Sequence, residues 1–201
     1  MALWPDVYRV LLENEYVRVL EIRMEPGERD DWHGHPPSAG YVLSAGTIRT
    51  YASDGTFKDV VARPGMAGAH PAIPQHRMEN VGSTEVHILF AERKGDPPRL
   101  SQAYLDAPSV EPEVYRVVAE SDWFRVLEIH AAPGVEGAPH SHQASVVYAL
   151  GEAHVAHTPP GEGAVEQTLP AGKALYVPAV AEHTARNLGT TPMRVVMLEL
   201  K

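Results

Sequence analysis

The chain repeats itself at a fixed offset of 107 residues. A gap-free alignment of Pro5–Lys94 with Pro112–Lys201 contains 28 identities in 90 positions. A repeat at one constant offset is typical of a duplicated domain, and it limits the possible folds before any secondary structure is assigned. The sequence therefore predicts two related domains, residues 1–94 and 112–201, joined by a linker over residues 95–111.

Each copy is expected to be all-β. Eighteen Pro and sixteen Gly residues interrupt many short apolar runs, a pattern typical of sandwiches and barrels. Tight turns are expected at Pro26-Gly27 and Asp54-Gly55, and a hairpin is expected around Ala45-Gly46. The one short helix expected lies at Pro98–Leu105, within the linker. The strands expected in the first copy are Tyr8–Leu12, Val17–Met24, Tyr41–Ser44, Thr47–Tyr51, Lys58–Ala62, Met66–His70, Arg77–Val81 and Val86–Arg93. Eight short strands per copy suggest a closed two-sheet roll.

Charge and composition narrow the possible partners. A net charge of −9 argues against nucleic acid or an anionic membrane as a partner, because both require a basic surface. The N-terminus does not match a signal peptide, and no apolar run reaches the roughly 18 residues of a membrane span. The absence of cysteine fits a cytoplasmic protein. We expect a small-molecule substrate as the partner, and a homodimer stays open.

Both copies contain three histidines at matching positions. The first copy has His33, His35 and His76, and the second has His140, His142 and His183. Alternate residues of a strand share one face, so each His-x-His pair projects together, and the later histidine can approach it from a neighbouring strand. Imidazole is a common ligand for Zn, Fe, Cu, Ni and Mn. An isolated His-x-His would favour surface or hydrogen-bonded core histidines over metal ligands, but the repeated triplet favours one metal per barrel.

The spacing of these residues resembles the two sequence motifs of the cupin superfamily. Gly27-x5-His33-x-His35 precedes Gly65-x5-Pro71-x4-His76-x3-Asn80, and both motifs recur 107 residues later. The resemblance covers nearly the whole chain and implies a bicupin, with two tandem jelly-roll barrels (double-stranded β-helices). It also implies that the motif histidines bind a metal inside each barrel.

One departure from the family pattern affects the expected metal site. Many cupins have a metal-binding glutamate four or five residues after the His-x-His, but this chain has Gly40 and Val147 there. A three-histidine site leaves the full 2+ charge of the metal uncompensated, which favours anionic or enolisable substrates. We expect a divalent transition metal, with Fe(II) favoured and Zn, Mn, Ni or Cu as alternatives.

The resemblance implies several functions. Three-histidine iron cupins include dioxygenases, so the leading expectation is a dioxygenase that acts on a small organic acid or enolisable carbonyl compound. The alternatives are a non-redox Zn or Mn isomerase, lyase or cyclase, and a non-catalytic module that binds a small ligand or metal. A fold does not choose among these functions, because function depends on the site.

Several other side chains are candidates for the sites. In the first copy, His70 is a candidate acid–base, and Arg49 and Arg77 are candidate clamps for a carboxylate. Asp30 and Asp31 are expected to be solvated loop residues. The corresponding candidates of the second copy are His154, His157 and Tyr176; the two histidines differ by three along a strand, so one of them is expected to face solvent.

The first barrel is expected to be the more active one. It has His70, Arg49 and Arg77, where the second has Val177, Ala156 and Thr184. The latter residues are small or apolar and offer no anion clamp.

Overall fold

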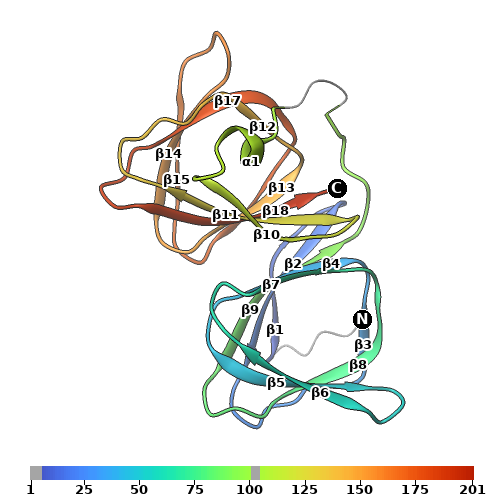
Figure 1. Ribbon diagram of the computed structural model, residues 1–201. Helices are drawn as coiled ribbons and strands as arrows, with labels where there is room; N and C mark the ends of the chain where they lie inside the picture. Colours follow the sequence, from blue (N-terminus) through green and yellow to red (C-terminus); the bar gives the residue numbers. More distant parts are fainter. Residues whose placement is uncertain (1–5, 101–104) are drawn as a thin grey trace. The chain divides into compact units, whose positions relative to one another are not determined.

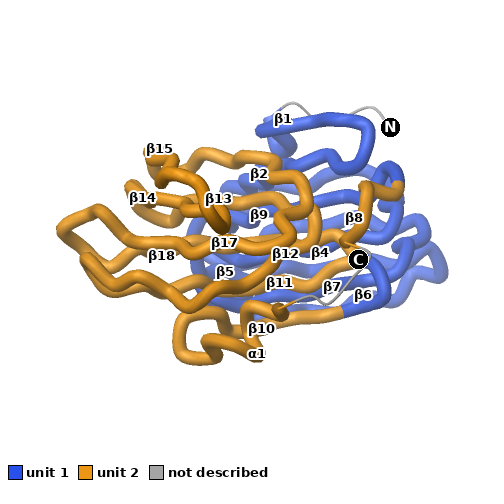
Figure 2. The backbone as a smooth tube through the Cα atoms, turned by 90° about the horizontal axis from the view of Figure 1, so that it is seen from above, with its two compact units in different colours: residues 1–95, 121–123 blue, residues 96–120, 124–201 orange. Residues whose placement is uncertain are grey.

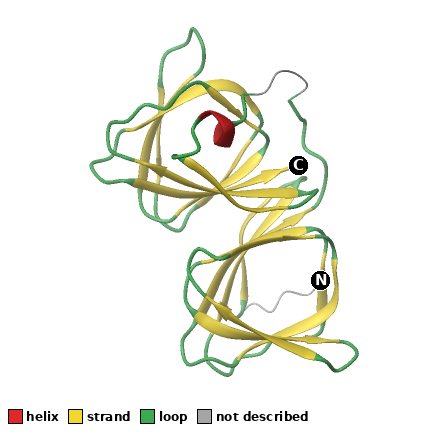
Figure 3. Cartoon of the chain, in the orientation of Figure 1, coloured by secondary structure: helices red, strands yellow, loops and turns green. Residues whose placement is uncertain are grey.

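The structure is a computed structural model that describes residues 6–100 and 105–201. The chain divides into two compact units, Met1–Gly95 with Ser121–Trp123 and Asp96–Glu120 with Phe124–Lys201 (Figure 2). Each unit is built almost entirely from β-strands (Figures 1 and 3). The two units therefore have the all-β architecture that the repeat predicts, and each is described by itself below.

The first unit contains two antiparallel sheets in its described part. The larger sheet has the order β1-β2-β9-β4-β7, and the smaller has the order β3-β8-β5-β6. Its strands are β1 (Tyr8–Glu13), β2 (Val17–Met24), β3 (His33–His35), β4 (Ser38–Val42), β5 (Gly46–Ala52), β6 (Phe57–Ala62), β7 (Ala67–His70), β8 (Ile73–Asn80) and β9 (Val86–Arg93). The strand order interleaves early and late strands, which is the jelly-roll pattern.

The second unit repeats this topology. Its larger sheet has the order β10-β11-β18-β13-β16, and its smaller sheet has the order β12-β17-β14-β15. Its strands are β10 (Tyr115–Glu120), β11 (Phe124–Ala131), β12 (His140–His142), β13 (Ser145–Ala149), β14 (Ala153–Thr158), β15 (Val165–Leu169), β16 (Ala174–Val177), β17 (Val180–Asn187) and β18 (Met193–Leu200). The chain is therefore an all-β protein with two tandem barrels.

A buried apolar cluster fills the interior of each barrel. In the first barrel both sheets contribute to it, through Leu20 and Phe90 of the larger sheet and Ile48 of the smaller. In the second, Leu127 and Met197 come from the larger sheet and Val155 from the smaller. Strands of both sheets alternate inward and outward side chains, so this alternation decides which polar residues reach the interior.

A shared turn precedes each histidine strand and explains several of the repeated residues. Gly27 and Gly134 adopt positive φ values of 81° and 72°, where other residues are strained. Their backbone N–H groups donate to the carbonyls of Asn80 and Asn187, both at 2.8 Å. The Asn80 side-chain amide also donates to the carbonyls of residues 24 and 84. The repeated glycine and asparagine thus fix the turn that leads into the histidine strand.

Some elements differ from those predicted from the sequence. The expected hairpin around Ala45-Gly46 is wrong, because β4 pairs with β7 and β9 while β5 pairs with β6 and β8. This segment instead crosses from one sheet to the other. The His-x-His segments form strands of their own, so the described part of each barrel has nine strands rather than eight.

The helix also differs from the prediction. Helix α1 spans Ala107–Val110 and not Pro98–Leu105, and residues 101–104 lie outside the described ranges. Ala107 is fully buried in the apolar cluster of the second barrel, which is why this short turn is held in place. Figure 3 draws α1 in red. No helical segment in the described ranges combines the length and the apolar character of a membrane span.

Candidate metal centres

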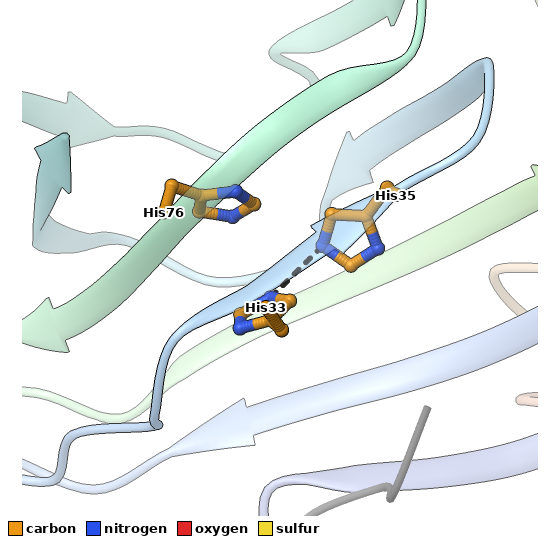
Figure 4. Close-up of side chains that lie close together, drawn as sticks. All are labelled: His33, His35 and His76. Atoms are coloured by element: carbon orange, nitrogen blue, oxygen red, sulfur yellow. Dashed lines mark hydrogen bonds between the residues drawn. The ribbon is translucent and has the colours of Figure 1, made fainter. Parts of the chain in front are cut away.

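The three histidines of the first barrel converge in its interior. His33 and His35 project from β3, and His76 projects from the neighbouring β8 (Figure 4). His33 pairs directly with His76, and a register shift before His35 leaves both side chains of the His-x-His directed at the same point. One ring nitrogen from each residue lies within 4.8 Å of the other two. The two Nε2 atoms of His33 and His35 are 3.0 Å apart.

Hydrogen bonds at the far ring nitrogens set the tautomers of this group. The Nδ1 atoms of His33, His35 and His76 lie 2.6, 2.6 and 3.2 Å from the Asp31 carbonyl, the Glu92 carboxylate and the Pro74 carbonyl. These acceptors place a proton on each Nδ1 and leave the Nε2 lone pairs free. Two lone pairs that face each other at 3.0 Å repel, and a cation between them removes that repulsion. The donor set therefore fits a metal ion.

The second barrel repeats the arrangement. His140 and His142 lie on β12 and His183 lies on β17, with one nitrogen of each again within 4.8 Å of the others. All three side chains are buried, whereas His33 of the first barrel is half-buried. Burial lowers the pKa of His183 to about 3 and that of His76 to about 4. The imidazoles of His183 and His76 are therefore neutral near pH 7, as metal ligands must be.

A buried glutamate orients one histidine in each barrel. Glu92 accepts a hydrogen bond from His35 Nδ1 at 2.6 Å, and Glu199 accepts one from His142 Nδ1 at 3.0 Å. The Nε atoms of Arg18 and Arg125 donate hydrogen bonds to the second carboxylate oxygens of these glutamates, at 2.6 and 2.7 Å. Both glutamates are only 1% exposed. Such outer partners fix ring orientation and raise the basicity of the metal ligand.

A tyrosine hydroxyl approaches each histidine group. The Tyr8 hydroxyl lies 3.3 Å from His33 Nε2, and the Tyr115 hydroxyl lies 2.9 Å from His140 Nε2. Burial raises the pKa of both phenols, with Asp30 adding to the effect at Tyr8 and Glu111 at Tyr115. Each barrel therefore has a neutral phenol group beside the nitrogens that face the metal position.

A carboxylate also lies beside each tyrosine, but the two come from different parts of the chain. Asp30 is 4% exposed, contrary to the expectation of a solvated loop residue, and it accepts 2.5 Å hydrogen bonds from the Tyr8 hydroxyl and the Met78 backbone. Desolvation raises its pKa. Its Oδ2 atom lies 3.7 Å from His33 Nδ1. Asp31 is exposed, as expected.

In the second barrel the position of Asp30 is taken by Gly137, and a carboxylate arrives from the segment after α1. Glu111 Oε2 lies 3.8 Å from His140 Nδ1, nearly the separation found for Asp30. A Cβ atom built on Gly137 would lie 2.6 Å from that same oxygen. Gly137 thus leaves the space that Glu111 fills, and the two carboxylates are equivalent in position although they are not aligned in sequence.

The second barrel encloses a cavity beside its histidines. The cavity has a volume of about 280 Å³, and its lining includes His142, His183, Tyr115 and Ser145. His157 of β14 also lines it, with its ring centroid 5.5 Å from that of His183. Burial lowers the pKa of His157.

The other candidates of the second copy point outward. His154 lies 3.3 Å from Glu166 on the exposed β14–β15 hairpin, so the prediction that one of the two hairpin histidines faces solvent is confirmed. Leu175 and Val177 line the cavity, so Tyr176 between them projects from the opposite face of β16.

The predicted arginine clamp of the first barrel is wrong. Ile48 and His76 point inward, so Arg49 and Arg77, one residue further along each strand, point outward. Arg49 donates two hydrogen bonds to Asp59 at 2.7 and 2.8 Å on the outer hairpin. The Arg77 guanidinium lies over the ring of Tyr51, 4.7 Å from its centroid.

His70 lies on the inward face of the larger sheet. Its partner on β4 is Ser38, which pairs on the other side with Glu92, the residue that contacts His35. Directly paired residues of antiparallel strands share a face. The exposed His70 ring folds over Gly68, where a Cβ atom would lie 2.4 Å from Nε2. The structure therefore keeps His70 as a candidate, while its catalytic role stays a prediction.

The sequence analysis missed the side chains that support the histidines. A signal for most of them was available, because Tyr8, Arg18 and Glu92 are identical to their counterparts 107 residues later. Glu21, three residues after Arg18, faces the other side of β2 and pairs with Arg9 and Arg23. Glu111 carried no such signal, because it precedes the aligned part of the second copy.

Among the described residues, the converging ligand atoms of each group are histidine nitrogens, without a carboxylate oxygen. Neutral nitrogen donors of this kind suit divalent transition metals. The groups therefore fit one divalent metal ion per barrel, held by His33, His35 and His76 and by His140, His142 and His183.

No family model and no curated protein sequence matches this chain. Solved structures do share its architecture. AerE from Microcystis aeruginosa superposes with a TM-score of 0.66 at 18% identity, covering 97% of each chain. Oxalate decarboxylase from Lactobacillus farciminis, in a formate complex, has a TM-score of 0.63 at 12% identity, covering 94% of this chain and 77% of that one. A variant oxalate decarboxylase from Bacillus subtilis has a TM-score of 0.62 at 13% identity, covering 92% and 69%. Identities this low show a shared fold.

Proposed function

The chain has the bicupin fold with a three-histidine group in each barrel, and we propose that it is a metal-dependent enzyme. We further propose that it acts on a small organic acid or an enolisable carbonyl compound, with Fe(II) as the metal and dioxygenation as the reaction. The single observation that carries the proposal is the convergence of neutral imidazole nitrogens on one point without a carboxylate among them.

The donor set supports this class of substrate. Three neutral ligands leave the charge of a divalent ion uncompensated and leave coordination positions free. When bound, the ion would supply Lewis acidity toward a chelating substrate and, as iron, a redox partner for dioxygen. The oxalate decarboxylase among the structural neighbours was solved with formate, a small carboxylate, which is consistent with an acidic substrate here.

The residues of the chain hold and shield the reacting groups. Glu92 and Glu199 keep His35 and His142 in the tautomer that presents Nε2 to the metal. The Tyr115 hydroxyl lies at His140 Nε2 and is placed to donate a hydrogen bond to a substrate oxygen, whereas the Tyr8 hydroxyl donates its proton to Asp30. The walls of the cavity in the second barrel are mostly apolar, and an apolar surrounding strengthens these polar interactions.

A non-redox isomerase, lyase or cyclase is the second candidate. The observation that favours it is the inward placement of His70, an imidazole outside the metal ligand group and on the same face as Glu92. When bound, Zn or Mn would supply Lewis acidity toward a carbonyl group of the substrate, and His70 would carry a proton to or from the adjacent carbon.

Oxygen uptake distinguishes the candidates. The Fe(II)-loaded full chain is assayed against a panel of small carboxylates, diketones and catechols. Uptake that requires both substrate and iron supports the dioxygenase. Turnover under nitrogen with Zn or Mn, without oxygen uptake, supports the second candidate. Silence in both assays, together with ligand-dependent shifts in melting temperature, would contradict an enzymatic function and identify a binding module.

A further inference from the structure

The cavity of the second barrel is large relative to its few polar groups. A buried apolar cavity of roughly 150 Å³ is sufficient to bind benzene. The cavity here measures about 280 Å³. It therefore has room for a ligand with a single ring or a branched chain together with a polar head group. Its walls are mostly aliphatic, and they include Val147, Leu169, Leu175, Val177 and Met197.

The polar groups of the cavity belong to a short set. The polar side chains that line it are those of Tyr115, His142, Ser145, His157, Gln167 and His183. Ser145 is fully buried, and its Oγ atom has no hydrogen-bond partner in the described structure. Ser145 pairs with Glu199, the residue that contacts His142, so its side chain lies on the face that carries the metal site. A buried hydroxyl without a partner is costly unless a ligand supplies one.

The lining contains no charged side chain. Among the described residues around the cavity there is no Lys, Arg, Asp or Glu. An anionic head group can therefore be neutralised only at the histidine end, where a divalent ion fits. A second carboxylate on the same ligand would be desolvated against aliphatic walls without a counter-charge, which is strongly unfavourable.

We propose, on the basis of the proposed function, that the second barrel binds a monocarboxylic acid with an apolar body of one ring or one branched chain. The carboxylate lies at the histidine end within reach of Ser145 and His157, and the apolar body fills the aliphatic part. Small dicarboxylates such as oxalate are poor ligands of this cavity.

The first barrel differs at the positions that define this cavity. His157, Val177, Ala185 and Met197 correspond to Thr50, His70, Met78 and Phe90 at the repeat offset. Phe90 packs against His35 with ring centroids 4.8 Å apart, and Met78 packs on the apolar cluster. The larger Phe90 and Met78 occupy interior space that Met197 and Ala185 leave open. The proposed specificity therefore belongs to the second barrel.

The test is calorimetric titration of the Zn-loaded full chain with acetate, phenylacetate and oxalate, because Zn binds ligands without redox turnover. Burying an aromatic ring is expected to strengthen binding by about tenfold to a hundredfold. Phenylacetate should therefore bind at least about tenfold more tightly than acetate. Oxalate should show no such gain. Metal content is measured on the same samples, so a chain that takes up no Zn contradicts the proposed function itself.

Two variants locate the ligand. Val177→Phe adds a ring to the wall of the cavity that Val177 lines, and it should abolish the gain of phenylacetate over acetate. Val165→Phe is the control, because Val165 is 62% exposed on β15. Ser145→Ala removes a hydroxyl that has no protein partner, so it should leave folding unchanged and weaken phenylacetate binding by about tenfold or more. Ser38→Ala, its counterpart in the first barrel, should have no effect on this binding.

Either of two results would overturn the inference while leaving the proposed function intact. Equal affinities for acetate, phenylacetate and oxalate in Zn-loaded protein would do so. Phenylacetate binding that survives both Val177→Phe and Ser145→Ala would also do so, because the ligand would then lie outside the second cavity.

Discussion

The two barrels of this chain share the residues that orient their histidines and differ in those that surround a ligand. Tyr8, Arg18 and Glu92 recur as Tyr115, Arg125 and Glu199, with the same contacts to the histidine group. The residues that line the two barrel interiors differ. The carboxylate beside the tyrosine comes from a loop in the first barrel and from the segment after α1 in the second. The residues proposed to hold a metal and those proposed to select a ligand therefore form separate sets.

This comparison also changes the expectation about which barrel is the more active. Arg49 and Arg77, two of the three residues that favoured the first barrel, point away from its interior. The second barrel has His157 inside a defined cavity. We therefore expect substrate selection in the second barrel, with metal binding in both.

Removing the buried glutamates should have the largest effect, and the effect should be equal in the two barrels. Glu92→Ala and Glu199→Ala each leave an arginine and a histidine without their buried partner. We expect each to destabilise its barrel by about 3–5 kcal/mol and to weaken metal binding there by about 10- to 100-fold. Urea unfolding and competition with a chromophoric chelator measure both effects.

Glu13→Ala is the control, since Glu13 forms an exposed pair with Lys94. It should leave metal affinity unchanged. Unchanged metal affinity in Glu92→Ala or Glu199→Ala would contradict the orienting role of the glutamates.

Moving the carboxylate tests whether Asp30 and Glu111 are equivalent. Glu111→Ala should weaken metal binding in the second barrel by about tenfold. The double variant Glu111→Ala/Gly137→Asp should recover most of this loss, because it restores the arrangement of the first barrel. Gly137→Asp alone should displace the flexible end of the Glu111 side chain, since the new Cβ atom would lie 2.6 Å from Glu111 Oε2. Chelator competition on each variant gives the affinities. A double variant no better than Glu111→Ala would disprove the equivalence.

Acid should destabilise the second barrel more than the first in metal-free protein. In the second barrel, burial lowers the pKa of His183 to about 3 and also lowers the pKa values of His140 and His157. In the first histidine group, burial lowers the pKa of His76 to about 4. Unfolded histidines titrate near about 6.5. Below that pH the unfolded chain binds more protons, so stability is full above it and falls as pH decreases toward these values.

Hydrogen–deuterium exchange resolved by peptide, corrected for intrinsic rates, measures this loss at pH 7 and pH 5. The second barrel should lose more protection than the first. Greater loss in the first barrel would show that other groups dominate its acid response.

Changing the outer arginine should have the smallest effect. Arg49→Ala removes an exposed contact with Asp59 on the hairpin that faces away from the histidines. Exposed ion pairs contribute little to stability. Metal content, phenylacetate binding and melting temperature should therefore match those of the unchanged chain. Loss of metal or ligand binding would restore Arg49 as a site residue.

Much of the fold was predictable because the repeat supplies long-range information. The turns at Gly27 and Asp54-Gly55 and most strands follow from local sequence, and the gap-free alignment transfers them to the second copy. The pairing partners of β5 were not predictable in the same way. A two-residue connection at Ala45-Gly46 looks like a hairpin locally, but packing of the two sheets directs the chain across the barrel.

The histidine groups were also predictable, whereas their surroundings were only partly so. Strand alternation explains why His33 and His35 point together, and it also places Arg49 outside once Ile48 is known to be in the core. The sequence alone did not show which face was inward. Glu111 reaches its site only through the turn after α1, and a contact between residues so placed cannot be read from strand patterns.

Metal stoichiometry tests the central claim most directly. The untagged full chain is reconstituted with a divalent metal and freed of excess ion. Its bound metal is then measured by inductively coupled plasma mass spectrometry. We expect about two equivalents per chain, and about one equivalent in either His76→Ala or His183→Ala, because each barrel supplies its own three ligands. Less than about a tenth of an equivalent in the unchanged chain, or loss of both ions in a single variant, would contradict the account.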